Sequence, residues 1–130
     1  MRSVSTNKTV AICLLVLVLT FLSLEPWGPI ETREFSHLGP AVFWGFNAFL
    51  GALLLASFIT IPLAWKNRKY AFWMAIILGW MFVIVLSLDL SHVFPTSPDS
   101  MGFLLGLIEI IDSILALYVI FFSHKALVHF

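Results

Sequence analysis

Four long apolar runs, separated by short polar segments, constrain this chain more than any other feature of its sequence. They occupy residues 10–24, 40–65, 70–88 and 101–123. A helix rises about 1.5 Å per residue and needs roughly 20 residues to cross about 30 Å of hydrocarbon, so the last three runs reach that length or come close to it. The first run is shorter, but polar residues before it can extend the helix at the interface while the Lys8 side chain reaches water.

The composition indicates that lipid is the solvent for these runs. Hydrophobic residues make up 61% of the 130-residue chain and charged residues 11%, whereas a soluble domain is about half apolar and about a quarter charged. Too little polar surface remains to cover such a core in water. Because lipid offers the backbone no hydrogen-bond partners, each run must be helical. We therefore predict an all-α fold, a four-transmembrane-helix bundle in a single integral-membrane domain over residues 1–130, with spans at about 7–24, 40–65, 70–92 and 101–123.

The first run could instead be a cleaved signal peptide, because Arg2 and Lys8 precede an apolar stretch of suitable length. The sequence that follows, Phe-Leu-Ser-Leu-Glu-Pro-Trp, offers no small-x-small cleavage site, which favours an uncleaved helix. Cys13 is the single cysteine, so the chain has no disulfide framework.

The distribution of basic residues predicts the orientation. Of the seven Lys and Arg residues, only Arg33 falls in the segments predicted to lie on the outer side. The others are Arg2, Lys8, Lys66, Arg68, Lys69 and Lys125. Short loops rich in Lys and Arg stay in the cytoplasm. The pattern therefore predicts cytoplasmic termini and outer loops at roughly 25–39 and 90–100, in a multi-pass protein of the inner (plasma) membrane. The bilayer is the expected partner, and nothing indicates nucleic acid.

A short motif occurs twice at the predicted outer surface, as Glu-Phe-Ser-His-Leu-Gly-Pro and as Asp-Leu-Ser-His-Val-Phe-Pro. Each copy places an acid three residues before a histidine, Glu34 before His37 and Asp89 before His92. Such pairs from two helices, together with single acids from two more, form the di-metal plan of four-helix bundles. These four residues are the candidate metal ligands, and a divalent metal such as zinc, iron, copper or nickel is the cofactor that they indicate.

A simpler interpretation of the repeated motif needs no metal. In it, Ser36 and Ser91 are local capping groups and the neighbouring histidines lie at the wet interface.

Polar residues inside the apolar runs identify the candidate binding site. They are Asn47, Asp89, Glu109 and Asp112. An ionised carboxylate at the bilayer centre costs on the order of 3 kcal/mol, so these side chains should face other helices, a partner subunit or water. At about 1.5 Å per residue, Asn47 lies roughly 10 Å below the outer surface, Glu109 about 12 Å and Asp112 about 16 Å.

Helical periodicity predicts which neighbours share a face with each polar residue. Helix four should have one small and acidic face, with a Gly-x-x-x-Gly pattern at 102–106 that permits close helix approach, and one large apolar face. The first face carries Leu105, Gly106, Glu109, Asp112, Ser113 and Ala116, and the opposite face carries Phe103, Leu107, Ile111, Ile114 and Tyr118. Asn47 should share its face with Phe43, Gly51 and Phe58, and Asp89 with Ala71, Ala75 and Phe82.

These patterns favour a polar site that opens to the outer side and binds a proton, a cation or a small polar ligand, for transport or as a channel, in an oligomer. An accessory or assembly subunit of a larger membrane complex is the alternative, because no basic residue lies inside an apolar run to pair with the acids. A membrane-embedded metal-dependent enzyme is the third. No catalytic residue is assigned, since the chain has no nucleophile elbow, phosphate loop, Cys-x-x-Cys or zincin helix.

Overall fold

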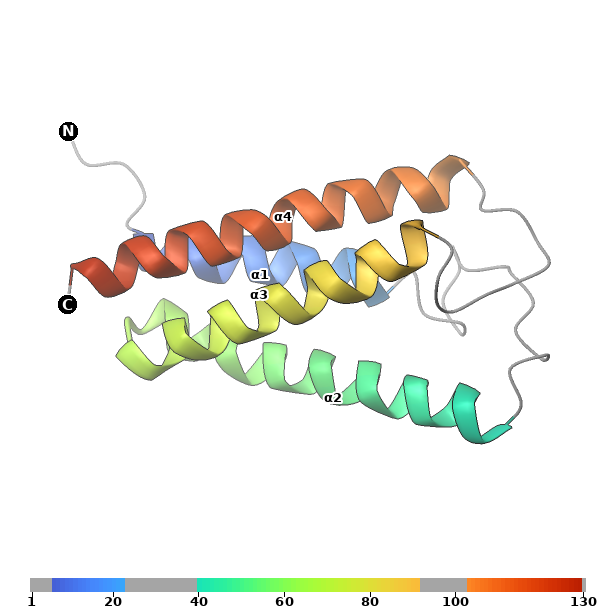
Figure 1. Cartoon of the computed structure of the whole chain (residues 1–130). Helices are drawn as coiled ribbons and strands as arrows, with labels where there is room; N and C mark the ends of the chain where they lie inside the picture. The colour runs from blue at the N-terminus through green and yellow to red at the C-terminus, as the bar shows by residue number, and fades with distance from the viewer. Residues whose placement is uncertain (1–5, 23–39, 92–102, 130) are drawn as a thin grey trace.

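The computed structural model describes residues 6–22, 40–91 and 103–129, and every regular element in this part of the chain is an α-helix (Figure 1). The helices are α1 (Thr6–Leu22), α2 (Pro40–Trp65), α3 (Lys69–Leu90) and α4 (Phe103–Val128). They form a four-helix bundle, as the sequence predicts.

Three of the four helices are long and apolar enough to cross a membrane. They are α2, α3 and α4, and the chain is therefore a multi-span membrane protein. Helix α1 is also apolar but has 17 residues, about 25 Å at the α-helical rise. Helix α4 runs to Val128, past the predicted end at 123, because no proline or glycine follows that would stop it.

The helices pack in a ring that follows the order of the sequence. Helix α1 contacts α2 and α4, while α3 contacts α2 and α4, so the diagonal pairs lie across the bundle from each other. The start of α1 at Thr6 and the end of α4 at Val128 lie at the same end as the α2–α3 turn (Figure 1). We call this the termini end, and the opposite end, where α1 and α3 finish and α2 and α4 begin, the far end.

Apolar side chains fill the interior and also cover the outside. The fully buried ones include Leu14 and Leu17 of α1 and Phe72 and Phe82 of α3. Phe82 meets Phe21 of α1 edge to face, with the ring centroids 5.0 Å apart, so the core extends across the diagonal. Large hydrophobic side chains are exposed on all four helices, as expected where lipid is the solvent.

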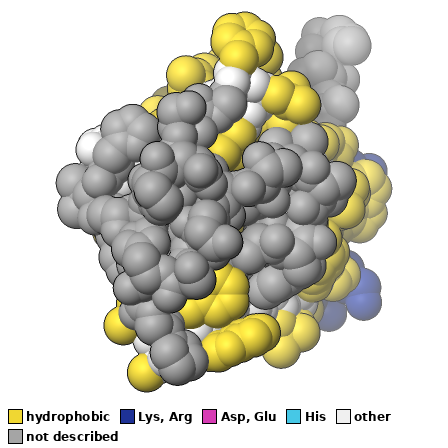
Figure 2. All heavy atoms as spheres, turned by 90° about the vertical axis from the view of Figure 1, so that its right-hand side faces the viewer, with side chains coloured by type: hydrophobic (Ala, Val, Ile, Leu, Met, Phe, Trp, Pro, Cys, Tyr) yellow, Lys and Arg dark blue, Asp and Glu magenta, His cyan; other side chains and the backbone are white. Residues whose placement is uncertain are grey.

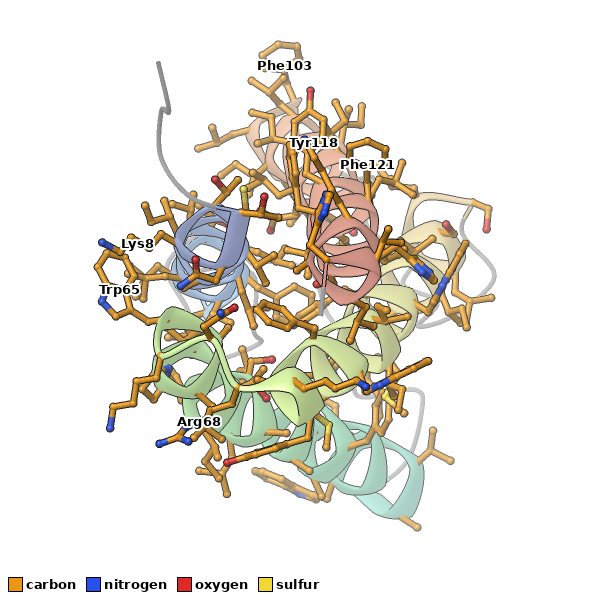
Figure 3. All side chains as sticks on the ribbon, turned by 90° about the vertical axis from the view of Figure 1, so that its left-hand side faces the viewer. Lys8, Trp65, Arg68, Phe103, Tyr118 and Phe121 are labelled. Atoms are coloured by element: carbon orange, nitrogen blue, oxygen red, sulfur yellow. The ribbon has the colours of Figure 1, made fainter. Side chains whose placement is uncertain are left out.

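Burial confirms the predicted faces of α3 and α4. The Glu109 face of α4 is turned inward, while Phe103, Tyr118 and the other members of the predicted apolar face are exposed. In the end-on view of Figure 3, Phe103, Tyr118 and Phe121 project away from the bundle. The side chains expected to share a face with Asp89 are all buried. Gly102 lies outside the described residues.

The predicted face of α2 is partly wrong. Asn47 is buried, but Gly51 and Phe58 are exposed. The buried stripe of α2 instead passes from Asn47 through Leu50 and Leu54 to Ser57, at three- and four-residue steps. In an apolar helix every face is hydrophobic, so the sequence pattern alone gives few grounds for choosing among them.

The α2–α3 connection is a tight turn with a defined hydrogen-bond pattern. The Asn67 N–H donates to the Ala64 carbonyl at 2.9 Å, and the Arg68 N–H donates to the Leu63 carbonyl at 3.0 Å. Asn67 has a φ of 63°. This is a Schellman motif, in which asparagine is one of the few residues that accept the left-handed conformation.

Candidate functional site

Each of the four predicted ligand-binding residues is buried inside the bundle. The exposed fraction is 4% for Asn47, 9% for Asp89, 1% for Glu109 and 0% for Asp112. All four lie in the half of the bundle nearer the far end, since Asp89 ends α3 while the others occupy the early turns of α2 and α4. In the view from the far end, the described side chains that can be seen are mostly hydrophobic (Figure 2).

Asp112 of α4 is joined to α1 through Thr20. The Thr20 hydroxyl donates a hydrogen bond to Asp112 Oδ1. The same hydroxyl lies 2.9 Å from the Val16 carbonyl and 3.0 Å from the Leu17 carbonyl, both on its own helix. A threonine hydroxyl has one proton to donate, so these acceptors are alternatives and the hydroxyl can turn between them.

The second carboxyl oxygen of Asp112 points into the protein without a partner. Oδ2 is buried and has no hydrogen-bond partner within the described residues. A buried carboxyl oxygen in that position is costly if the group is charged. The site is therefore suited to a carboxyl group that holds a proton or binds a cation.

Glu109 lies on the same face of α4, one turn closer to the far end than Asp112. The three-residue spacing corresponds to about 4.5 Å along the axis and brings the side chains close together. Two ionised carboxylates at this spacing in a medium of low dielectric constant would repel each other. The Ser113 hydroxyl donates to the Glu109 backbone carbonyl at 2.8 Å, within the same helix.

Asn47 contributes an acceptor from α2. Its Nδ2 donates to the Phe43 carbonyl at 2.9 Å, which fixes the amide along the helix. Its Oδ1 is buried and has no hydrogen-bond partner in the part of the chain that the structure describes. Asn47 thus offers a neutral oxygen ligand in the same half of the bundle as the three acids.

Most of the predicted metal ligands lie outside the described residues. The three that lie outside are Glu34, His37 and His92. The fourth, Asp89, lies in the last turn of α3. Within the described ranges, no group of three or more His, Cys, Asp or Glu side chains could hold a metal ion. Ser91 donates its hydroxyl to the Ser87 carbonyl at 2.7 Å, and this bond confirms the capping interpretation at that position.

The sequence interpretation missed Thr20. Threonine is common in apolar helices, where its hydroxyl bonds to the helix backbone, as Thr60 does here with the Ala56 carbonyl at 2.8 Å. Thr20 makes that local contact as well, and only the packing of α1 against α4 adds the bond to Asp112. The available signal was a hydroxyl residue in the second half of the first apolar run, where Ser23 is the other polar residue.

The chain matches one family model, described as "Domain of unknown function (DUF8051)", over residues 6–129. It therefore belongs to this family. No curated protein and no solved structure matches the chain.

Proposed function

We propose that this DUF8051 protein binds a proton or a small cation at Asp112, reached from the far end of the bundle, and handles that ion in transport or as a channel. The proposal includes an inner-membrane location, cytoplasmic termini and an opening on the outer side. The observation that carries it is the environment of Asp112, which is fully buried, bonded to Thr20, and has one carboxyl oxygen without a partner in the described part of the chain.

Thr20 can form a hydrogen bond with Asp112 both when the Asp112 carboxyl is ionised and when it carries a proton. When Asp112 is ionised, the Thr20 hydroxyl donates to it. When Asp112 carries a proton, the carboxyl can donate to Thr20, and Thr20 can donate to the Val16 carbonyl at 2.9 Å. Each state keeps the Thr20 hydroxyl hydrogen-bonded, so exchange of the proton or cation leaves α1 and α4 in contact.

The direction of access follows from the distribution of charge along the bundle. The described acids are Asp89, Glu109 and Asp112, all in the far half, and the described Lys and Arg side chains are at the termini end. A cation that enters from the far end meets none of the described Lys and Arg side chains before it reaches the acids, whereas one that enters from the termini end first meets fixed positive charge. An excess of Lys and Arg also supports assignment of the termini end to the cytoplasm.

Ion flux in liposomes that contain only this protein tests the proposal. We expect wild-type protein to dissipate an imposed proton or cation gradient and the Asp112→Asn variant to lose most of that flux, because an amide cannot exchange a proton. Ser113→Ala is the matched control, since Ser113 is next to Asp112 but bonds to its own helix. The proposal is wrong if correctly inserted wild-type protein carries no flux, or if Asp112→Asn carries as much as wild type.

An accessory-subunit role is the second candidate, and one surface favours it. The first half of α2 has an exposed face on which a Cβ at Gly45 or Gly51 would meet no atom within 4 Å, and Trp44 is 63% exposed there. Small residues of this kind let another helix approach closely in a membrane. Site-directed crosslinking from Ala48, between the two glycines, tests it, with Ile114 on α4 as the control position. Crosslinks to another membrane protein only from Ala48 would support it, and crosslinks to lipid alone would exclude it.

A further inference from the structure

We propose that the termini end of the bundle binds the headgroup of an anionic phospholipid, between the start of α1 and the α2–α3 turn. This site is separate from Asp112 and does not depend on the proposed function or on which leaflet the termini end occupies. All the Lys and Arg side chains in the described ranges are at this end, and each is exposed. They are Lys8, Lys66, Arg68, Lys69 and Lys125. None of the described acids is at this end.

Two contacts hold the start of α1 against the end of α2. The Asn7 side chain donates from Nδ2 to the Trp65 carbonyl at 2.8 Å. The Lys8 ammonium lies over the Trp65 ring, 5.2 Å from its centroid. In the end-on view of Figure 3, Lys8, Trp65 and Arg68 lie on the same side of the bundle. These contacts add the charge of α1 to the charges of the turn, although the two segments are far apart in the sequence.

The α2–α3 turn supplies the other three cations on a fixed backbone. Lys66, Arg68 and Lys69 fall within four residues, and the Schellman hydrogen bonds hold the chain between them. Arg68 is the N-cap residue of α3, and its side chain makes no capping hydrogen bond. The Arg68 side chain is exposed, and its guanidinium can bind a phosphate through two parallel N–H groups.

The exposed aromatic residues show at what depth these charges lie. Trp65, Tyr70 and Trp73 are 48%, 60% and 56% exposed, within one or two turns of the cations. Exposed tryptophan and tyrosine on membrane helices lie at the level of the lipid headgroups. A lipid phosphate is then at the right depth for the cluster while its acyl chains contact the apolar sides of the helices. A soluble polyanion would have only the charges, and this difference favours a phospholipid as the ligand.

Lipid retention by the purified full-length protein tests the site. The protein is equilibrated with mixed micelles of phosphatidylglycerol and phosphatidylcholine, and the bound lipids are counted by native mass spectrometry. We expect preferential retention of phosphatidylglycerol that weakens as salt rises. Each Lys or Arg near a membrane surface contributes about 1 kcal/mol, so the triple variant Lys66→Gln, Arg68→Gln, Lys69→Gln should bind it about 100-fold more weakly.

Two control variants test whether the lipid binds at this site or is attracted by positive charge in general. The Lys66→Arg, Lys69→Arg variant keeps the charge and should retain the lipid as wild type does. Lys125→Gln removes one cation from the last turn of α4, which belongs neither to the start of α1 nor to the α2–α3 turn, and should weaken binding less than about fivefold. Circular dichroism confirms that each variant is folded. Equal retention of the two lipids by wild type, or wild-type retention by the triple glutamine variant, would overturn the proposal.

Discussion

Helix α4 packs against its two neighbours in different ways. Against α3 the contact is close and apolar, because a Cβ added to Gly79 would lie 2.6 Å from Ile120 Cγ1 and 3.3 Å from the Ala116 carbonyl oxygen. Against α1 the contact includes the hydrogen bond between Thr20 and Asp112. Lipid is as apolar as leucine, so helices in a membrane associate through close packing and through interhelical hydrogen bonds. The α3–α4 interface depends on close packing at Gly79. The α1–α4 interface depends in part on a hydrogen bond to the Asp112 carboxyl, a group that can gain or lose a proton.

Enlarging Gly79 should have the largest effect. Gly79→Leu places a branched side chain where even a methyl group conflicts with Ile120, and we expect a loss of about 3 kcal/mol in the free energy of unfolding, at the upper end of the range for overpacked sites. Thermal unfolding in detergent, followed by circular dichroism, measures it. Gly51→Leu is the matched control, since a Cβ there meets nothing within 4 Å. Similar melting temperatures for the two variants would show that the α3–α4 interface is not close-packed at Gly79.

Removing the Thr20 hydroxyl should have an intermediate effect. Thr20→Val keeps the shape of the side chain but removes the bond to Asp112, and interhelical hydrogen bonds in membranes contribute about 0.6 to 2 kcal/mol. A double-mutant cycle with Asp112→Leu isolates the pair, and we expect a coupling energy of about 1 kcal/mol. A coupling energy of zero would mean that the bond does not stabilise the α1–α4 interface.

Replacing Asp112 by asparagine should have the smallest effect on stability. The amide oxygen can still accept from Thr20, so we expect a change within about 0.5 kcal/mol together with the loss of ion flux proposed above. The same thermal melts measure the stability. If Asp112→Asn unfolds as readily as Gly79→Leu, its loss of flux would reflect damage to the fold, and the two interfaces would not have separate roles.

The sequence predicted the helices and their polar residues, because both depend on local chemistry. A run of apolar residues as long as the bilayer is thick must be helical, and an acid within it must avoid lipid. The inward faces of α3 and α4 followed from helical periodicity, since acidic residues in each of those helices indicate which face turns away from lipid. The face of α2 was harder to predict, because one asparagine among uniformly apolar residues does not fix the direction in which Gly51 and Phe58 point.

By itself, then, the sequence determined that this protein is a membrane-embedded helical bundle with the acids of its apolar runs turned inward and all but one of its basic residues toward one end. Only the tertiary structure decided which residues from different helices meet. It pairs Thr20 with Asp112, Gly79 with Ile120, and Lys8 with Trp65. The reason is physical. The polarity of a residue and its place on its own helix decide whether its side chain faces lipid or protein. The contacts between helices depend instead on the depth and rotation at which separate helices pack.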